Sequence, residues 1–175
     1  PTPQEVTVVP GAPIPDAGWI ADWSPDSAGR GRRISLLRGS IPFSDYRIEF
    51  EAQIESKALG WVFRGQNPDN FYVTKLEVIK PGLEPTVALV HFAVINGREQ
   101  DRAQVPLPLP VRVDTTYKIR FEALGTRFTT WVQDQKIDEW NDSRIASGGA
   151  GLYSERGESA PLQGAFNVTQ LVVRY

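Results

Sequence analysis

Two adjacent stretches, SDYRIEFEAQIE (residues 44–55) and GWVFRGQNPDNFYVTKLEV (residues 60–78), decide the fold. In the first stretch, apolar and polar side chains alternate along the chain. One face carries Tyr46, Ile48, Phe50, Ala52 and Ile54, and the other carries Arg47, Glu49, Glu51, Gln53 and Glu55. A helix would need apolar residues every three or four positions, and this run lacks that period. The stretch therefore predicts a β-strand with one buried face.

Strand signals of the same kind recur along the chain and are separated by turn-forming residues. Further strands are expected at 59–66, 71–80, 86–96, 116–124, 128–133, 136–140, 150–154 and 165–175. Asn96-Gly97, between two apolar runs, is a strong hairpin signal. No helix of two turns or more is indicated. The pattern predicts an all-β, two-sheet antiparallel sandwich of the jelly-roll kind.

Composition and charge exclude several classes of protein. The 175 residues carry a net charge of −2, so no basic excess points to a nucleic-acid partner. No apolar run reaches the roughly 18 residues of a membrane span. The chain contains no cysteine, which excludes thiol catalysis, zinc–thiolate sites and disulfides.

The chain is expected to form one domain with an extended start. Residues 1–15 are rich in proline and lack periodicity, so they read as an arm or linker. Residues 16–175 are expected to form the sandwich domain. The sequence begins with Pro1 and contains no methionine, so we expect an excised piece or mature form of a longer protein.

The polar residues of the first four strands are predicted to share one surface. We choose the register that keeps charge out of the core, because an unpaired buried charge costs several kcal/mol. The opposed pairs are then Glu51 and Val62, Arg64 and Val73, and Lys75 and His91. The four strands bury Ile48, Phe50, Ile54, Trp61, Phe63, Tyr72, Leu76, Val78, Val90, Phe92 and Val94 on one face. The other face carries Glu49, Glu51, Gln53, Arg64, Lys75, Glu77 and His91.

This polar face has two interpretations. It is either a solvated face with cross-strand ion pairs, each of which contributes little stability, or the floor of a binding groove. A second exposed surface is predicted on the hairpin 117–133, where Trp131 points outward beside Lys118 and Arg120. A flat ring on a polar sheet suits stacking on a sugar, and packing under a loop or partner domain explains it equally well.

Several segments resemble the concanavalin A-like sandwich superfamily. The stretches 44–55 and 60–78 resemble its DY-x-hydrophobic-x-F strand and the G-x-x-F-R…D-N-(F/Y)-Y hairpin that follows. VDTTYKIRFEALGTRFTTWVQDQKID (113–138) is similar to its W/Y-(K/R)-(V/I)-R-x-x-x-x-G hairpin. SGGAGLYSERGESA (147–160) and FNVTQLVV (166–173) are similar to its G-x-(V/A)-G-L strand and terminal strand. The resemblance covers residues 44–175 and implies a concanavalin A-like jelly roll.

Within that superfamily, the chain resembles laminin G-like binding domains and 3-keto-disaccharide hydrolase-like domains of exported bacterial proteins. The resemblance implies an extracytoplasmic location, periplasmic or at the cell surface, within a larger exported or membrane-anchored protein. The enzymatic members differ from this chain. It lacks the E-x-D-x-x-E strand of sandwich glucanases, and TKLEVIK (74–80) replaces the Q-hydrophobic-x-D segment usual in the hydrolase-like domains.

No motif indicates catalysis or a cofactor. Glu49 and Glu51 lie roughly 6.5–7 Å apart along a strand, a spacing that two-carboxylate chemistry tolerates. Arg64 opposite Glu49 would, however, hold that carboxylate ionised. His91, the only histidine, is expected to be structural. Calcium is possible at the oxygens of 67–70 or 141–142, which turn formation explains equally well.

Three functions are compatible with the sequence. The first is a non-catalytic module that binds carbohydrate through Glu49, Glu51, Arg64, Lys75, Glu77, His91 and Trp131. The second is a glycoside hydrolase-like enzyme acting on a di- or oligosaccharide, with Glu51, Glu77 and Arg64 as candidates. The third is a structural or adhesion domain without a small ligand. The lack of a catalytic set favours the first.

Overall fold

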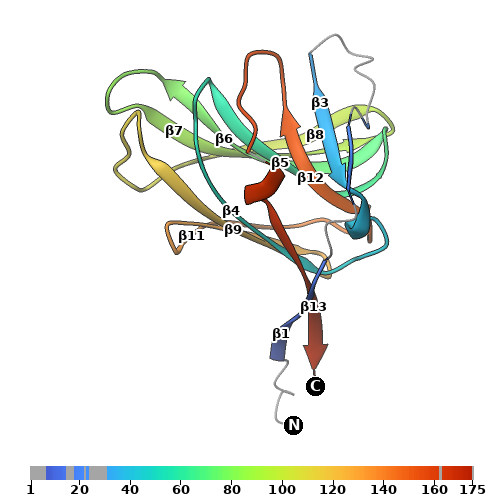
Figure 1. The fold of residues 1–175 in the computed structure, drawn as a ribbon. Helices are drawn as coiled ribbons and strands as arrows, with labels where there is room; N and C mark the ends of the chain where they lie inside the picture. Colours follow the sequence, from blue (N-terminus) through green and yellow to red (C-terminus); the bar gives the residue numbers. More distant parts are fainter. Residues whose placement is uncertain (1–6, 15–17, 22, 24–30, 162, 175) are drawn as a thin grey trace.

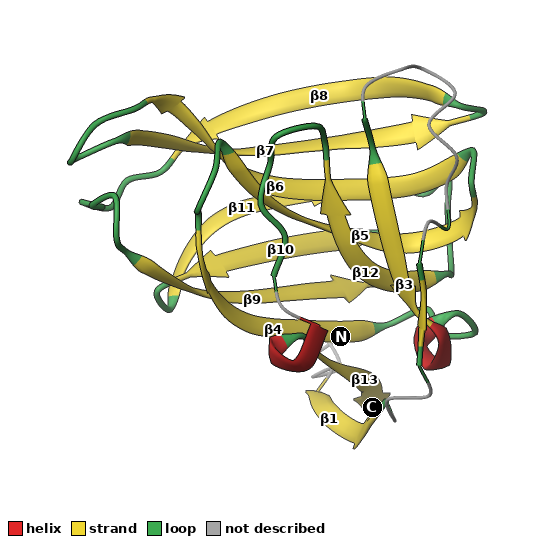
Figure 2. Ribbon diagram, turned by 45° about the horizontal axis from the view of Figure 1, so that its top comes forward, coloured by secondary structure: helices red, strands yellow, loops and turns green. Residues whose placement is uncertain are grey.

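The computed structural model describes residues 7–14, 18–21, 23, 31–161 and 163–174, which form two antiparallel sheets packed face to face (Figures 1 and 2). The six-stranded sheet has the order β1 (Thr7–Pro13), β13 (Asn167–Arg174), β4 (Tyr46–Gln53), β9 (Thr116–Leu124), β10 (Arg127–Val132) and β11 (Gln135–Asn141). The seven-stranded sheet has the order β2 (Trp19–Ile20), β3 (Arg33–Leu37), β12 (Gly149–Ser154), β5 (Ala58–Asn67), β6 (Asn70–Lys80), β7 (Thr86–Ile95) and β8 (Arg98–Pro106). Two short 3-10 turns, η1 (Arg38–Ser40) and η2 (Gln163–Ala165), complete the fold. The predicted all-β antiparallel sandwich is confirmed.

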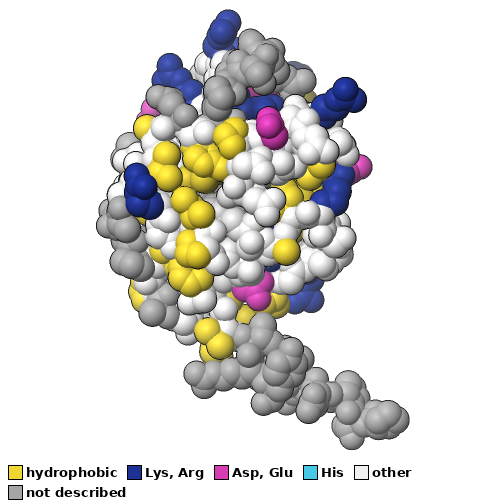
Figure 3. All heavy atoms as spheres, turned by 90° about the vertical axis from the view of Figure 1, so that its right-hand side faces the viewer, with side chains coloured by type: hydrophobic (Ala, Val, Ile, Leu, Met, Phe, Trp, Pro, Cys, Tyr) yellow, Lys and Arg dark blue, Asp and Glu magenta, His cyan; other side chains and the backbone are white. Residues whose placement is uncertain are grey.

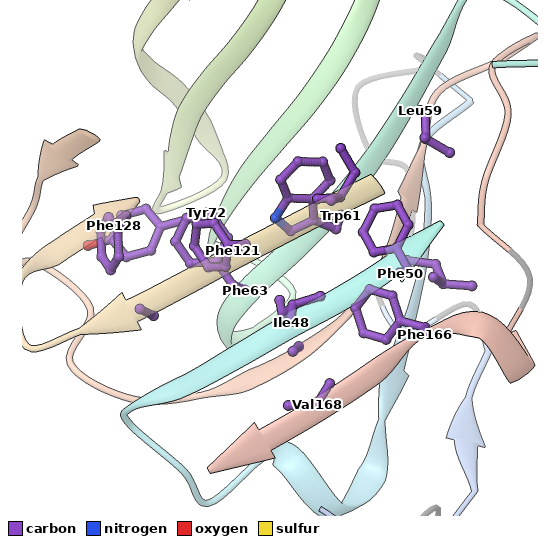
Figure 4. Packing of buried hydrophobic residues seen from close by; sticks show 14 of the residues in the cluster. Ile48, Phe50, Leu59, Trp61, Phe63, Tyr72, Phe121, Phe128, Phe166 and Val168 are labelled. Carbon is purple, nitrogen blue, oxygen red and sulfur yellow. The ribbon is translucent and has the colours of Figure 1, made fainter. Parts of the chain in front are cut away.

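The core lies between the sheets and is dominated by aromatic rings (Figure 4). The Phe63 ring on β5 lies 4.3 Å, centroid to centroid, from Phe121 on β9. Phe50 on β4 meets Trp61 on β5 edge to face at 5.5 Å. Each buried ring removes about 150–250 Å² from water, and each such pair adds about 0.5–1.5 kcal/mol. The alternation in 44–55 is therefore explained, because Tyr46, Ile48 and Phe50 face this core.

A second apolar cluster covers the outer face of the seven-stranded sheet. It consists of Ile34, Leu36, Val62, Phe71, Val73, Val90, Phe92, Val94 and Tyr153, all fully buried. Trp23 packs edge to face on Phe71 at 6.2 Å, and the guanidinium of Arg32 lies 5.5 Å from the same ring. Strands β5 to β7 are therefore buried on both faces in their central parts.

The predicted register is wrong. Strand β4 does not pair with β5, since Glu51 lies opposite Lys118 on β9. Arg64 falls in a β-bulge, and Lys75 lies opposite Val90 rather than His91. As a result, Val90, Phe92 and Val94 belong to the outer cluster instead of the core that contains Trp61.

Three strands at the start of the chain were not expected. Residues Thr7–Pro13 of the predicted arm form β1, which pairs with β13, and β3 pairs with β12. Figure 1 shows β1 and β13 extending together beyond the body of the sandwich. Gly151 on β12 permits the close approach of β3, because a Cβ there would overlap the carbonyl oxygen of Ser35.

The outside of the molecule has apolar patches at one end. Figure 3 shows the end at the right of Figure 1, where hydrophobic side chains gather in separate patches. Separate patches of this kind are usual on globular domains. No helix in the described part of the chain is long and apolar enough to span a membrane.

Buried tyrosines predict a loss of stability at alkaline pH. Burial raises the pKa of Tyr46, Tyr72 and Tyr153 well above the ordinary value of 10. Above about pH 10, the unfolded chain therefore binds fewer protons than the folded one, and the loss of stability rises toward a limit of about 1.4 kcal/mol per pH unit for each such tyrosine. Tyr46→Phe should make the free energy of unfolding fall less steeply with pH, because the contribution of one buried tyrosine is removed. Urea denaturation at several pH values between about 10 and 11 measures this slope. An unchanged slope would contradict the assignment.

Candidate functional site

The structure distributes the predicted site residues over two opposite faces and the interior. Glu49, Glu51 and Trp131 lie on the outer face of the six-stranded sheet. Lys75 and Glu77 lie on β6, on the outer face of the seven-stranded sheet. Arg64 and His91 are buried elsewhere. The predicted single polar face therefore does not exist.

The outer face of the seven-stranded sheet carries a connected group of charges around Lys75, which is only 1% exposed. Its ammonium donates hydrogen bonds to Glu155 at 2.7 Å and to Glu158 at 2.9 Å. Burial lowers the pKa of Lys75, and the two carboxylates outweigh that effect, so its pKa lies above the ordinary value. Gly60 makes room for it, because a Cβ there would lie 3.1 Å from the Lys75 Cβ. Lys75 is therefore held as a fixed cation.

Arg102 on β8 extends the same group toward solvent. It donates to Glu99 at 2.8 Å and lies 3.6 Å from Glu77. Its guanidinium also covers the Phe92 ring at 5.4 Å. Burial lowers the pKa of Arg102, but the nearby carboxylates of Glu99, Glu77 and Glu155 raise it by more. The pKa of Arg102 therefore lies above its ordinary value. We call Lys75, Glu77, Glu99, Arg102, Glu155 and Glu158 the ion cluster.

A hollow of about 360 Å³ opens beside the ion cluster, lined by residues 154–158, Gly31 and Arg33. The preceding residue in the chain, Tyr153 on β12, accepts a hydrogen bond from Arg32 Nε at 3.2 Å. Shifted pKa values beside a hollow are typical of functional sites. Sequence reasoning found Lys75 and Glu77 but missed Arg102, Glu155 and Glu158.

Arg64 proves to be an internal brace rather than a surface ligand. Its backbone has φ = 50° in the β5 bulge, and its residue is 1% exposed. The guanidinium donates to the carbonyl oxygens of Ser44 and Ile145 at 3.0 and 3.2 Å, and to Asp45 at 3.3 Å. These bonds join the turn before β4 to the loop before β12.

His91 points into the sandwich and not onto a polar face. Its Nδ1 lies 2.7 Å from Asp138 Oδ2, and its ring stacks on Trp140 at 4.1 Å with an interplanar angle of 2°. Asp138 and Trp140 belong to β11 of the opposite sheet. His91 therefore links the two sheets, in agreement with the structural role expected for it.

The oxygen-rich turns have structural partners. Asn67 Oδ1 accepts hydrogen bonds from the Asp69 amide and from Asn70 Nδ2, both at 2.9 Å. Asp142 accepts from Tyr72 Oη at 2.6 Å and pairs with Arg144. Within the described ranges, no three His, Asp or Glu side chains are grouped to hold a metal ion.

The candidate hydrolase set is not assembled. Glu51 lies on one outer face, Glu77 on the opposite outer face, and Arg64 is buried at a bulge. These three residues therefore cannot act on one glycosidic bond.

No family model and no curated protein matches the chain. Among solved structures, carbohydrate-binding module CBM66 from Bacillus subtilis is similar with a TM-score of 0.58 and 19% identity, over 90% of this chain and 96% of that one. A protein of unknown function with a galectin-like fold, also from B. subtilis, gives 0.61 and 14% over 96% and 100%. A glycosidic hydrolase gives 0.52 and 11% over 97% and 95%. At these identities the likeness establishes the fold alone: the chain is a two-sheet antiparallel jelly-roll sandwich.

Proposed function

We propose that this chain is a non-catalytic carbohydrate-binding module whose ligand lies on the outer face of the seven-stranded sheet, over the ion cluster. The observation that carries the proposal is a buried lysine fixed between two carboxylates at the rim of a hollow on that face. The fold of the chain is also similar to that of a carbohydrate-binding module. A fold alone does not define a ligand, and it is the ion cluster that supplies chemistry able to bind one.

The chemistry of the cluster matches sugar hydroxyl groups. Each hydroxyl both donates and accepts hydrogen bonds, so it pairs well with a carboxylate and a cation placed side by side. Arg102 and Glu77 supply such a pair at the solvent-facing edge of the ion cluster, where their side chains are 42% and 29% exposed. The other members of the cluster hold this pair in place before the ligand arrives, which lowers the entropic cost of binding.

Stability alone is a weak reason for the cluster. Charges removed from water seldom stabilise a fold more than apolar residues of the same volume would. The sheet face around Lys75 is otherwise apolar, with Val73, Val90 and Phe92 as neighbours. A ligand that uses the charges accounts for their presence there.

The location of the protein is also a proposal. The fold shared with a carbohydrate-binding module from a bacterium supports a secreted domain acting on extracytoplasmic glycans. Fractionation of the native host with an antibody to this domain tests it, and a purely cytoplasmic signal would contradict it.

Arg102→Ala is expected to weaken glycan binding by about 10- to 100-fold, because one charge-assisted hydrogen bond contributes about 1.5–3 kcal/mol. A glycan array identifies ligands of the wild type, and calorimetry compares the variants. Arg112→Ala is the matched control, since Arg112 is 65% exposed, lies 3.9 Å from Asp114 and belongs neither to the ion cluster nor to the hollow beside it. Equal loss in both variants, or no loss in Arg102→Ala, would contradict the proposal.

The same samples distinguish binding from hydrolysis. A binding module leaves the glycan intact, so no reducing ends should accumulate over hours. Sustained release that is lost in Glu77→Gln would show an enzyme at this face instead.

A further inference from the structure

Four outward side chains of the six-stranded sheet form one row across its strands. Asn167 on β13 lies opposite Glu49 on β4, and Glu49 lies opposite Arg120 on β9. Arg120 in turn lies opposite Trp131 on β10. Adjacent strands are about 4.8 Å apart, so the row extends over about 14 Å.

This row forms the floor of a hollow of about 420 Å³, which also includes Glu51 and Lys118. We call this hollow the groove. Its volume falls within the range of about 300–1,000 Å³ found for ligand sites. It lies on the face opposite the ion cluster, with the core between them.

Lys118 pairs with Asp134 within the groove at 3.2 Å, but three other polar groups of the groove have unused hydrogen-bonding capacity. Neither Glu49 nor Glu51 forms an ion pair within the described chain, and the buried Nε of Arg120 has no hydrogen-bond partner. The next row differs, because Arg47 and Glu122 pair there at 3.1 Å. A buried donor without a partner costs about 1–3 kcal/mol. The charged side chains are thus paired with each other in the row of Arg47 and Glu122, but not in the row of Glu49 and Arg120. This difference points to a ligand that binds the charges of the second row.

The aromatic member of the row is held in a defined position. The Arg120 guanidinium lies 4.4 Å from the centre of the Trp131 ring, and Trp131 remains half-buried. An apolar ring beside carboxylates and a guanidinium matches a sugar, which has an apolar face and hydroxyl groups at its edge. Two unpaired carboxylates on one strand disfavour an anionic ligand.

We propose that the groove is a second binding site, which takes a neutral saccharide chain lying across the strands. One sugar ring stacks on Trp131, and the following units reach Glu49 and Asn167. Since the row is longer than a single ring, an oligosaccharide fills it better than a disaccharide does. With sites on opposite faces, one domain can hold two glycan chains at once.

This second site extends the proposed function, and calorimetry with cello-, xylo-, manno- and laminari-oligosaccharides of two and six units tests both. The Arg102→Ala background isolates the groove from the ion cluster. We expect at least tenfold tighter binding of a six-unit than of a two-unit ligand there, and at least a tenfold loss on adding Trp131→Ala. Asn167→Ala, at an exposed position, provides a second variant that leaves the packing of Trp131 intact.

Arg127→Ala is the control on the same sheet, because Arg127 is exposed and does not line the groove. If Arg102→Ala alone removes all binding, the groove inference is wrong and the proposed function stands. If Trp131→Ala alone removes all binding, the groove stands and the ion cluster is not the site. No binding by the wild type to the panel would overturn both.

Discussion

Lys75→Met is expected to lower the free energy of unfolding by about 3–5 kcal/mol, the usual result of removing one partner from a buried ion pair. The substitution keeps the volume of the side chain and removes its charge. Glu155 and Glu158, whose side chains are 18% and 10% exposed, would then repel each other without a cation between them. Urea denaturation measures the change.

Two further variants define the cause of this loss. Lys136→Met removes an exposed ammonium that lies 3.1 Å from Glu139, and it should cost no more than about 0.5 kcal/mol. Adding Glu155→Gln and Glu158→Gln to Lys75→Met should restore part of the stability, because it removes the unpaired charges. A cost below about 1 kcal/mol for Lys75→Met would show that the ammonium is not fixed between these carboxylates.

Arg64→Met should destabilise the fold by about 3 kcal/mol, because it leaves buried carbonyl oxygens without donors. Two of the three bonds lost go to the carbonyls of Ser44 and Ile145. Saccharide affinity of the folded variant should stay within twofold of the wild type, since Arg64 lies on neither outer face. Denaturation and calorimetry on the same sample separate the two effects.

Arg127→Met is the matched control for this prediction. Arg127 is 54% exposed and has one contact of 3.7 Å with Glu139, so its loss should change stability by less than about 0.5 kcal/mol. A stable Arg64→Met protein that no longer binds saccharide would contradict this prediction and support the ligand-binding role that the sequence predicts for Arg64.

The strands could be predicted from the sequence because their signals are local. Alternation placed β4 correctly, and Asn96 and Gly97 do form the expected turn, with φ of 52° and 79°. Alternation does not reveal which sheet a strand joins. The neighbours of β4 are β9 and β13, which lie more than 60 residues later in the chain. Assuming instead that consecutive strands pair led to the wrong register.

One signal in the sequence would have improved the prediction. Strand β7 reads TVALVHFAVI, and a nearly continuous apolar run is typical of a strand buried on both faces. The prediction that β7 is buried on one face only therefore missed the outer apolar cluster. The partners of Lys75 had no such signal, because Glu155 and Glu158 follow it by 80 and 83 residues in a loop.

The most direct test of the account is amide NMR mapping of saccharide binding, which suits a domain of 19.5 kDa. At saturation with a glycan identified on the array, we predict shifts of the amides of Lys75, Glu77, Phe92 and Arg102. These positions lie on β6, β7 and β8 beneath the ion cluster. Saturated binding that leaves all four amides unshifted would contradict a carbohydrate site on this face.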